Sequence, residues 1–294
     1  MLDMPLEKIA STHKKCYEML MWYLRFLPKN SLSRFVGELA NLEEPKPLVS
    51  AAKNWFAKKY QLNMQEAELP LAEYASISKL FTRKLKPGLR PIGLGLVNPC
   101  DARLTCAEHI ESDQIIQAKG QSYKLSEFLR VNPDDILAKF SGGLALTYYL
   151  CPTDYHRVHS PVDGELEMIE HVPGALWAVN DWSTQNIDRL FAVNERVIFW
   201  LRTALGPVAL VMVGATNVGK ISVSVGPESF QSTFTTNAKG VSEPRQQAFM
   251  PAVTVKKGQE IGVFNMGSTV IMVYPAKCLN VIPKLGPVKM GATV

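Results

Sequence analysis

The sequence predicts an α+β protein in which an N-terminal helical region precedes a β-rich core of mainly antiparallel strands. Up to about residue 85, apolar residues recur at helical spacing. From about residue 90, runs rich in Val, Ile and Thr are separated by corners rich in Pro, Gly and Asn. The chain has 294 residues, 47% hydrophobic and 20% charged, which is enough apolar material for a large packed core. We therefore expect a helical region over residues 1–90 and a β-rich core over 91–294.

The first expected helix covers residues 6–27, where apolar residues three, four and seven positions apart form one stripe that ends at Pro28. Its segment MLMWYLRFL (19–27) is rich in Trp, Tyr and Leu and has basic residues around it, which fits a helix lying in a bilayer interface. An ordinary docking helix for a neighbouring domain or subunit fits the pattern equally well. Shorter helices are expected at 31–40, 48–60, 63–68 and 76–85.

The core is expected to hold several short strands. Their composition places them at 145–150, 165–170, 196–202, 208–214 and 220–226. The runs 196–202 and 208–214 are close enough to form a hairpin through 203–207. A further apolar strand is expected in FNMGSTVIMVYP (264–275), which has a small, hydroxyl-bearing corner at its entrance.

The net charge of +5 is modest, so it suits an anionic membrane surface without demanding nucleic acid as a partner. Basic residues gather near the N-terminus, with five between Lys79 and Arg90 and no acidic residue among them. The five cysteines are scattered without a CxxC pair, which argues against a disulfide framework or a zinc knuckle. No apolar run reaches the roughly 18–20 residues that a spanning helix needs. We expect a protein that is soluble or lies on a membrane.

Two patterns point to ligands only weakly. GATNVGK (214–220) matches the first part of a phosphate loop, but Ile221 stands where a Ser or Thr is needed, and the next residues alternate like a strand. A corner between strands is therefore favoured. His156 and His159, with Asp154 nearby, suggest a metal site, but zinc needs three or four ligands and no third His or Cys is suitably spaced. We predict no metal.

Three stretches carry the residue types of an activated nucleophile. They are NPCDARLT (98–105), DYHRVHSPVDGELEMIEHVPGALWAVN (154–180) and FNMGSTVIMVYP (264–275). Together they supply an acid, two close imidazoles and a hydroxyl. In such a site a histidine takes the serine proton, and an aspartate fixes its tautomer and stabilises the imidazolium. Taken alone, each is a weak signal, because Gly-Ser-Thr is common in loops and an isolated His is more often structural than a base.

These stretches resemble the phosphatidylserine decarboxylase family. KKGQEIGVFNMGSTVIMVYP (256–275) is similar to the family's C-terminal processing site, a Gly-Ser-Thr after an apolar or aromatic lead-in, and residues 154–180 are similar to its histidine segment. Further similarity lies in LFTRKLKPGLRPI (80–92), IIQAKGQSYKLSEFL (115–129), NERV (194–197) and VGATNVG (213–219). The matches run in the family's order from about residue 80 to 275.

The resemblance implies that the chain cuts itself between Gly267 and Ser268, giving a large chain (1–267) and a small chain (268–294). Asp101, His159 and Ser268 would form the self-cleaving triad, in which His159 deprotonates Ser268 and the serine oxygen attacks the carbonyl of Gly267. Gly267 suits this step because no Cβ hinders the attack. Ser268 would become a covalent pyruvoyl group, the cofactor of the enzyme.

The resemblance also implies the reaction, the decarboxylation of phosphatidylserine to phosphatidylethanolamine through a Schiff base between the substrate amine and the pyruvoyl group. His156 is expected to move protons at the substrate stage; alternatively, it only orients His159 or the lipid phosphate. The expected partners are phosphatidylserine, an anionic membrane surface and the two chains of the precursor, and a homodimer is left open. The expected location is peripheral, on the cytoplasmic face of the cell membrane.

Two other functions stay open: the same chemistry on a soluble amino acid, and a non-enzymatic, membrane-associated β-module whose Ser and His are structural. The sequence also departs from the family at one place. The family's acidic motif reads Asp-Gly, whereas Asp101 is followed by Ala102. If the residue after the aspartate must adopt positive φ, alanine would resist it.

Overall fold

The computed structural model describes residues 29–118, 121–216, 220–265, 268–279 and 281–294. Its helices are α2 (Lys29–Ala40), α3 (Lys46–Lys59), η1 (Leu71–Glu73), α4 (Ile77–Phe81), α5 (Leu125–Leu129), α6 (Pro133–Phe140), α7 (Asp181–Asn186), α8 (Leu190–Val193) and α9 (Glu228–Thr233). Its strands are β1 (Ala102–Ile110), β2 (Gln114–Ala118), β3 (Gln121–Lys124), β4 (Gly143–Leu150), β5 (Arg157–His159), β6 (Gly164–Val172), β7 (Arg196–Thr203), β8 (Gly206–Gly214), β9 (Ile221–Val223), β10 (Arg245–Val255), β11 (Glu260–Phe264), β12 (Ser268–Tyr274) and β13 (Gly286–Val288). The predicted α+β class is confirmed.

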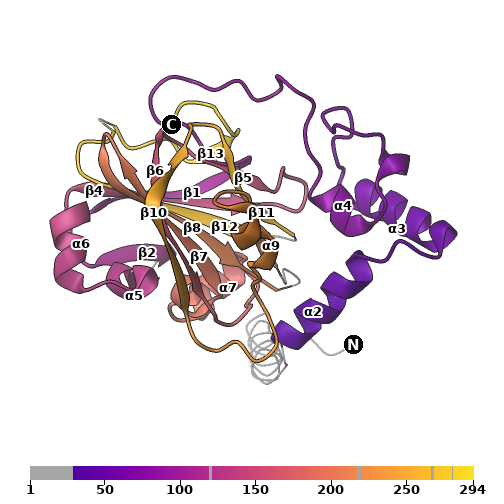
Figure 1. Cartoon of the computed structure of the whole chain (residues 1–294), viewed down its shortest axis with the longest axis horizontal. Coiled ribbons are helices and arrows are strands. Elements are labelled where there is room, and N and C mark those ends of the chain that lie inside the picture. The colour runs from indigo at the N-terminus through magenta and orange to yellow at the C-terminus, as the bar shows by residue number, and fades with distance from the viewer. Residues whose placement is uncertain (1–28, 119–120, 217–219, 266–267, 280) are drawn as a thin grey trace, which may run out of the picture.

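The helices α2, α3 and α4 lie together on one side of the β-rich body, and α5 and α6 lie at its other side (Figure 1). The helices predicted at 31–40 and 48–60 correspond to α2 and α3. The predicted helix at 76–85 begins as expected, with the Ser76 side chain capping the backbone N–H of Lys79, but it ends at Phe81. The helix predicted over 6–27 lies outside the described residues. No described helix has both the length and the apolar character needed to cross a bilayer.

The helix predicted over 63–68 is wrong. The segment forms turns, and Ala67 makes an isolated antiparallel bridge to Leu85. The side chain of Asn63 does act as a local acceptor, because its Oδ1 takes a hydrogen bond from the backbone N–H of Gln65 at 3.1 Å. Asn closes turns by the same bond that caps helices, so the capping-box spacing alone did not distinguish the two.

The main sheet has eight strands in the order β10-β6-β7-β8-β12-β4-β1-β13, and every neighbouring pair is antiparallel. The predicted strands at 145–150, 165–170, 196–202 and 208–214 are β4, β6, β7 and β8, and β7 and β8 form the predicted hairpin, with Thr203 opposite Gly206. The strand predicted at 220–226 is shorter, spanning only β9. The apolar residues 270–274 of β12 are fully buried at the centre of this sheet.

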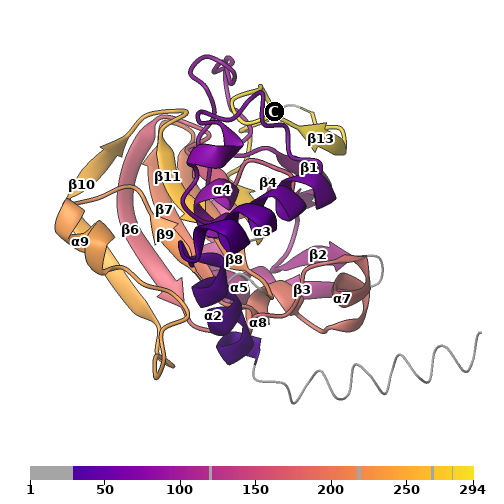
Figure 2. The same cartoon turned by 90° about the vertical axis from the view of Figure 1, so that its right-hand side faces the viewer.

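A second sheet of three strands, in the order β5-β11-β9, lies beside the main sheet. Figure 2 shows the N-terminal helices in front of this region. A small apolar cluster made by Phe56, Leu62, Tyr74, Leu80 and Phe81 packs α3 against α4 and is separate from the main core. The chain leaves the three-stranded sheet at the end of β11 and enters the main sheet at the start of β12. This crossing positions the candidate site.

Candidate active site

The bond between Gly267 and Ser268 lies at the crossing from β11 to β12. Before the crossing, the backbone N–H of Asn265 donates to the carbonyl of Lys220, at 2.9 Å, beside the small sheet. After it, Ser268 is paired on both sides, with β4 and with β8. The two flanks of the bond are therefore held by different sheets. The Gly-Ser-Thr stretch singled out in the sequence thus falls where the chain passes from β11 to β12.

The strand β5 brings both histidines of the predicted site next to β11. His159 is opposite Glu260, and the backbone N–H of Phe264 donates to the carbonyl of His156 at 3.0 Å. The pairing is antiparallel, so His156 lies at the end of β11 that leads into the crossing. His159 lies three residues further along the strand, about 10 Å away, where its N–H donates to the carbonyl of Pro99 at 2.8 Å.

His156 is fully buried beneath α4, with the ring of Phe81 centred 3.9 Å from its own. Its Nδ1 is 2.8 Å from the carbonyl oxygen of Asp154. A carbonyl can only accept, so Nδ1 carries the proton and Nε2 is a bare acceptor. Nε2 has no hydrogen-bond partner among the described residues. Burial lowers the pKa of His156 to about 3. The hydrogen bond to the Asp154 carbonyl raises the pKa and the positive charge of Arg83 lowers it, but both effects are smaller than that of burial.

His159 is also buried but has both ring nitrogens engaged. Nδ1 donates to the carbonyl oxygen of Gly258 at 2.8 Å, and Nε2 lies 3.1 Å from the hydroxyl of Tyr155. Since Nδ1 carries the proton, Tyr155 donates and Nε2 accepts. Burial lowers the pKa of His159 below its ordinary value, so the ring is neutral near pH 7. The tautomer that a base needs is thus fixed by a backbone carbonyl.

Asp101 is 2% exposed and bound by cations rather than by a histidine. Arg90 donates to both carboxylate oxygens, at 2.5 to 3.2 Å, while Lys289 and the backbone N–H of Met290 donate at 3.1 and 2.9 Å. Burial raises the pKa of Asp101, but the hydrogen bonds from Arg90 and Met290 and the two positive charges outweigh it and lower the pKa. The carboxylate is ionised and lies near His159 without a hydrogen bond to it in this arrangement.

The predicted site residues are therefore brought together only in part. Asp101 lies close to His159, because Pro99, two residues before Asp101, accepts a hydrogen bond from the backbone N–H of His159. His156 lies beside the entrance to β12. The Nδ1 of His159 donates to Gly258, and the oxygens of Asp101 accept from Arg90, Lys289 and Met290. The side chain of Ser268 and the placement of Gly267 lie outside the described part of the chain. The triad assignment stays a prediction.

Sequence reasoning missed Arg83, which lies beside the histidine segment. It is 4% exposed and donates from Nη2 to the carbonyl of Thr153 at 2.8 Å, while its Nε and Nη1 have no partner among the described residues. Burial lowers its pKa, yet the group stays charged because arginine begins so high. Arg83 belonged to the basic run 79–90, and no sequence signal separates a buried arginine in such a run from an exposed one.

The departure at Ala102 has no consequence for the backbone. Ala102 is the first residue of β1, pairs with Val288 of β13, and is absent from the described residues with positive φ. An extended backbone accepts alanine as readily as glycine. Asp101 is held at the start of this strand by its ion pairs.

Comparison with known proteins gives the same family along most of the chain. The model of the family described as "Phosphatidylserine decarboxylase" matches residues 77–294. A phosphatidylserine decarboxylase proenzyme of Anaeromyxobacter sp. is 39% identical over 267 residues, covering 90% of this chain and 92% of its own. Proenzymes of the same name from Shewanella baltica and Myxococcus xanthus are 41% and 38% identical, covering 84% and 87% of this chain and 85% and 89% of their own. The chain belongs to the phosphatidylserine decarboxylase family.

Proposed function

We propose that this protein decarboxylates phosphatidylserine to phosphatidylethanolamine after cutting its own chain between Gly267 and Ser268. Family membership supports the reaction. The observation that carries the proposal is the crossing from β11 to β12, where the predicted bond lies between two sheets and next to a buried histidine. A bond flanked by two fixed strands can be held in a reactive conformation without the chain moving away.

The self-cleavage consists of balanced steps on the chain itself. His159, neutral at Nε2, accepts the proton of Ser268 as Oγ attacks the carbonyl carbon of Gly267. The amide C–N bond breaks and an ester forms, leaving an amine on residue 268. Loss of the Cα proton and cleavage of the Cβ–O bond then release the Gly267 carboxylate and leave a dehydroalanine, which water converts to a ketone and ammonia. This requires Ser268 Oγ to reach His159 Nε2 in place of Tyr155.

The residues beside the crossing fit the pyruvoyl group that this sequence of steps would make. That ketone supplies an electron sink for the departure of carbon dioxide. His156 offers an unpaired, buried acceptor at Nε2, and the nearby Arg83 offers unpaired donors. A buried acceptor without a partner can take a hydrogen bond from a substrate group, and proton transfer there requires the pKa of His156 to rise from about 3 when the substrate binds. His156 is therefore the proposed proton-handling residue at the substrate stage.

The proposal is tested by incubating the purified protein with phosphatidylserine in mixed micelles and measuring phosphatidylethanolamine and carbon dioxide. Denaturing electrophoresis and intact mass should show a small chain of 27 residues (268–294 of 294) without a free amine. Free serine and other soluble amino acids serve as competing substrates. Faster decarboxylation of any of these than of the lipid would favour the soluble-substrate alternative, and an inert, uncut chain would favour the non-enzymatic one.

The membrane surface we propose is an apolar helical face on α2, α3 and their connection. It consists of Leu32, Phe35, Leu39, Leu42, Leu48 and Trp55, all exposed. The face borders a groove of about 370 Å³ between the two helices, and Lys59 lies 4.6 Å from the centre of the Trp55 ring. Apolar and aromatic side chains with nearby lysines suit an anionic bilayer interface.

The basic run 79–90 contributes less to this surface than its sequence suggested. Arg83 and Arg90 turn inward, Arg83 beside His156 and Arg90 onto Asp101. Lys79, Lys84 and Lys86 remain exposed. A peripheral position on the cytoplasmic face of the membrane is part of this proposal, and homodimer formation stays a prediction.

Replacing Leu48 and Trp55 together by Asp should lower binding of the full chain to anionic vesicles by at least about tenfold, because burying each side chain in the interface contributes roughly 1.5–3 kcal/mol. The measurement is co-sedimentation with vesicles containing phosphatidylserine. Met250→Asp is the matched control, since Met250 is 95% exposed on β10, away from these helices. Equal loss in the control, or unchanged binding of the double variant, would contradict the assignment. A chain lacking residues 1–27 tests that segment separately.

A further inference from the structure

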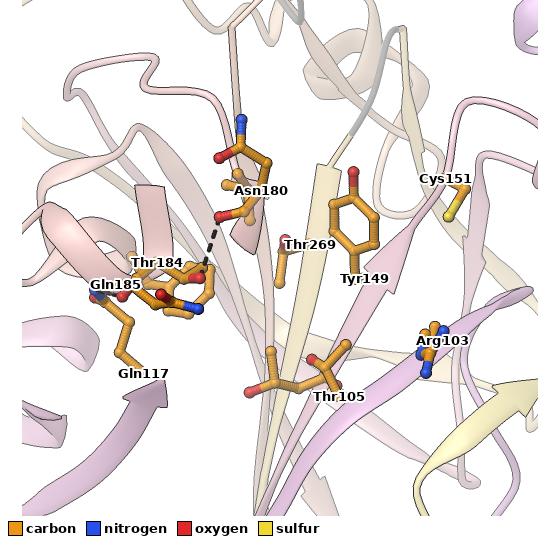
Figure 3. A pocket seen from close by; sticks show the side chains of 12 residues that line it. Arg103, Thr105, Gln117, Tyr149, Cys151, Asn180, Thr184, Gln185 and Thr269 are labelled. Carbon is orange, nitrogen blue, oxygen red and sulfur yellow. Dashed lines mark hydrogen bonds between the residues drawn. The ribbon is translucent and has the colours of Figure 1, made fainter. Parts of the chain in front are cut away.

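A cavity of about 540 Å³ opens on the face of the main sheet next to residue 268 (Figure 3). Its floor comes from β1, β4 and β12, and its far wall from α7, the residues before it and Gln117 of β2. One of the lining residues is Thr269, the residue that follows the predicted cleavage serine. The volume is in the range of pockets that take small organic ligands.

Three side chains form a row across the floor of this cavity. Arg103 of β1 is opposite Tyr149 of β4, and Tyr149 is opposite Thr269 of β12. Neighbouring strands are about 4.8 Å apart, so the backbone of Arg103 lies about 10 Å from that of Thr269. Residues directly opposite on neighbouring antiparallel strands point to the same face of the sheet, so the Arg103 side chain lies on the face that carries Tyr149 and Thr269. A small anion lying over Tyr149 would be within reach of the guanidinium and of the start of β12.

The charge of the lining selects an anion. Among the described residues that line the cavity, Arg103 is the one cation and no carboxylate is present. The guanidinium has no hydrogen bond or ion pair with another described residue. Arginine is well suited to phosphate because its planar donors bind two oxygens at once.

Two buried oxygen atoms of the lining also lack partners. Oγ1 of Thr269 and Oε1 of Gln117 have no hydrogen bond among the described residues, although both side chains are more than nine-tenths buried. Gln117 is held in place because its Nε2 donates to the carbonyls of Thr184 and Ile187 at 2.9 and 2.7 Å. A buried polar atom without a partner costs free energy unless a ligand satisfies it. The cavity thus has one cation, one hydroxyl at Thr269 that can donate to an anion, and one amide oxygen at Gln117 that only accepts and would take a hydrogen bond from the substrate's amino group or from water.

We propose that this cavity binds the glycerophosphoryl part of the lipid substrate, with Arg103 on the phosphodiester. The inference rests on the proposed function, because it assigns the headgroup pocket of that same reaction. The carboxylate of the substrate is the less suitable partner for Arg103. Its charge moves away as carbon dioxide leaves, and an arginine that stabilised it would favour the ground state over the transition state. The phosphodiester keeps its charge throughout, so Arg103 would bind the substrate and the transition state about equally, which affects KM and not kcat.

The kinetic test replaces Arg103 by Gln and measures decarboxylation in mixed micelles, where membrane attachment does not limit the rate. A charge-assisted hydrogen bond to phosphate contributes roughly 1.5–3 kcal/mol, so KM should rise about 10- to 100-fold while kcat changes less than about threefold. Arg103→Lys should recover part of the loss because it keeps the charge without the paired donors. Arg202→Gln is the control, since Arg202 is exposed and bound to Glu165 and Glu167 on β6. An unchanged KM, or a lower kcat at unchanged KM, would overturn the proposal.

Direct binding separates this inference from the proposed reaction. Glycerophosphoserine, free serine and inorganic phosphate are titrated by calorimetry into Ser268→Ala protein with and without Arg103→Gln. Binding of glycerophosphoserine that is lost with Arg103 supports the pocket even if no decarboxylation is ever detected. If the wild-type protein decarboxylates the lipid but the two Ser268→Ala proteins bind glycerophosphoserine equally well, the pocket is rejected and the proposed reaction stands. Equally tight binding of inorganic phosphate alone would show a general anion site and overturn the headgroup assignment.

Discussion

Ser268→Ala is expected to leave the protein as one uncut chain of 294 residues with no decarboxylase activity. Alanine has no oxygen to attack the carbonyl of Gly267 and none to be eliminated, so neither the ester nor the ketone can form. The loss should be complete rather than partial. The fold should be kept, because Ser268 begins β12 by backbone pairing with β4 and β8, and alanine preserves that pairing. Intact mass, activity and thermal unfolding measure the three parts of this prediction.

A ketone-trapping reagent provides the matched control. Hydroxylamine should inactivate the wild-type protein and add mass to its small chain, while the Ser268→Ala protein takes up none. Activity in the uncut alanine variant would mean that no group derived from Ser268 is needed. Cleavage of that variant at another bond would move the processing site elsewhere. Either result contradicts the assignment of Gly267 and Ser268.

The two histidines are expected to separate the self-cleavage from the reaction on the lipid. His159→Ala should slow the cut by about 10²- to 10⁴-fold, the range for loss of a positioned base, and leave the uncut chain to accumulate. His156→Ala should cut normally and then lose about 10²- to 10⁴-fold in kcat. Following the appearance of the small chain over hours, and then assaying the fully cut fraction, measures the two effects separately.

The structure makes this experiment decisive, because His156 and not His159 lies at the end of β11 that enters the crossing. If His156→Ala blocks the cut while His159→Ala does not, the roles are exchanged. A variant Tyr155→Phe serves as a control for His159. It removes the hydroxyl that occupies Nε2 and should speed the cut or leave it unchanged if that nitrogen is the base, whereas a slower cut would point to Tyr155 as part of the machinery.

The pH dependence of the cut follows from the sign of the shift at His159. Burial lowers its pKa, so the neutral base that the cut requires persists below the ordinary histidine range. The rate should be flat from about pH 6.5 upward and fall only in more acidic solution. His156, with a pKa of about 3, should give no titration step in this range. A rate that falls by half near pH 7 would contradict the buried, neutral state of His159.

Much of the fold could be predicted from the sequence because its signals are local. The alternation and turn residues of 196–214 specify a hairpin, and the structure forms it as β7 and β8. The failure at 63–68 was also local, since Asn63 makes one short-range hydrogen bond that turns and helix caps share. The antiparallel arrangement of the strands could be predicted from the short connections between them. The position of β12 between β4 and β8 could not, because it depends on pairing between segments that are distant in the sequence.

The candidate site was predictable in its residue types but not in its contacts. Asp101 was assigned to a histidine, yet its oxygens bind Arg90 and Lys289, the second of which is 188 residues away. Arg83 was counted in the basic run expected to face an anionic membrane surface, but it is buried beside His156. Both side chains are charged, and their neighbours come from other parts of the chain. Charge and spacing in sequence do not say whether an arginine faces water or another residue.

The place of β12 in the middle of the main sheet sets a limit on how long each enzyme molecule can work. On the proposed mechanism the reactive carbonyl is the first residue of a strand bound on both edges, so it is neither loaded from solution nor exchanged with it. Added pyruvate could not restore a molecule whose carbonyl had been damaged by a side reaction. Such a molecule is spent, and only synthesis of a new chain replaces it.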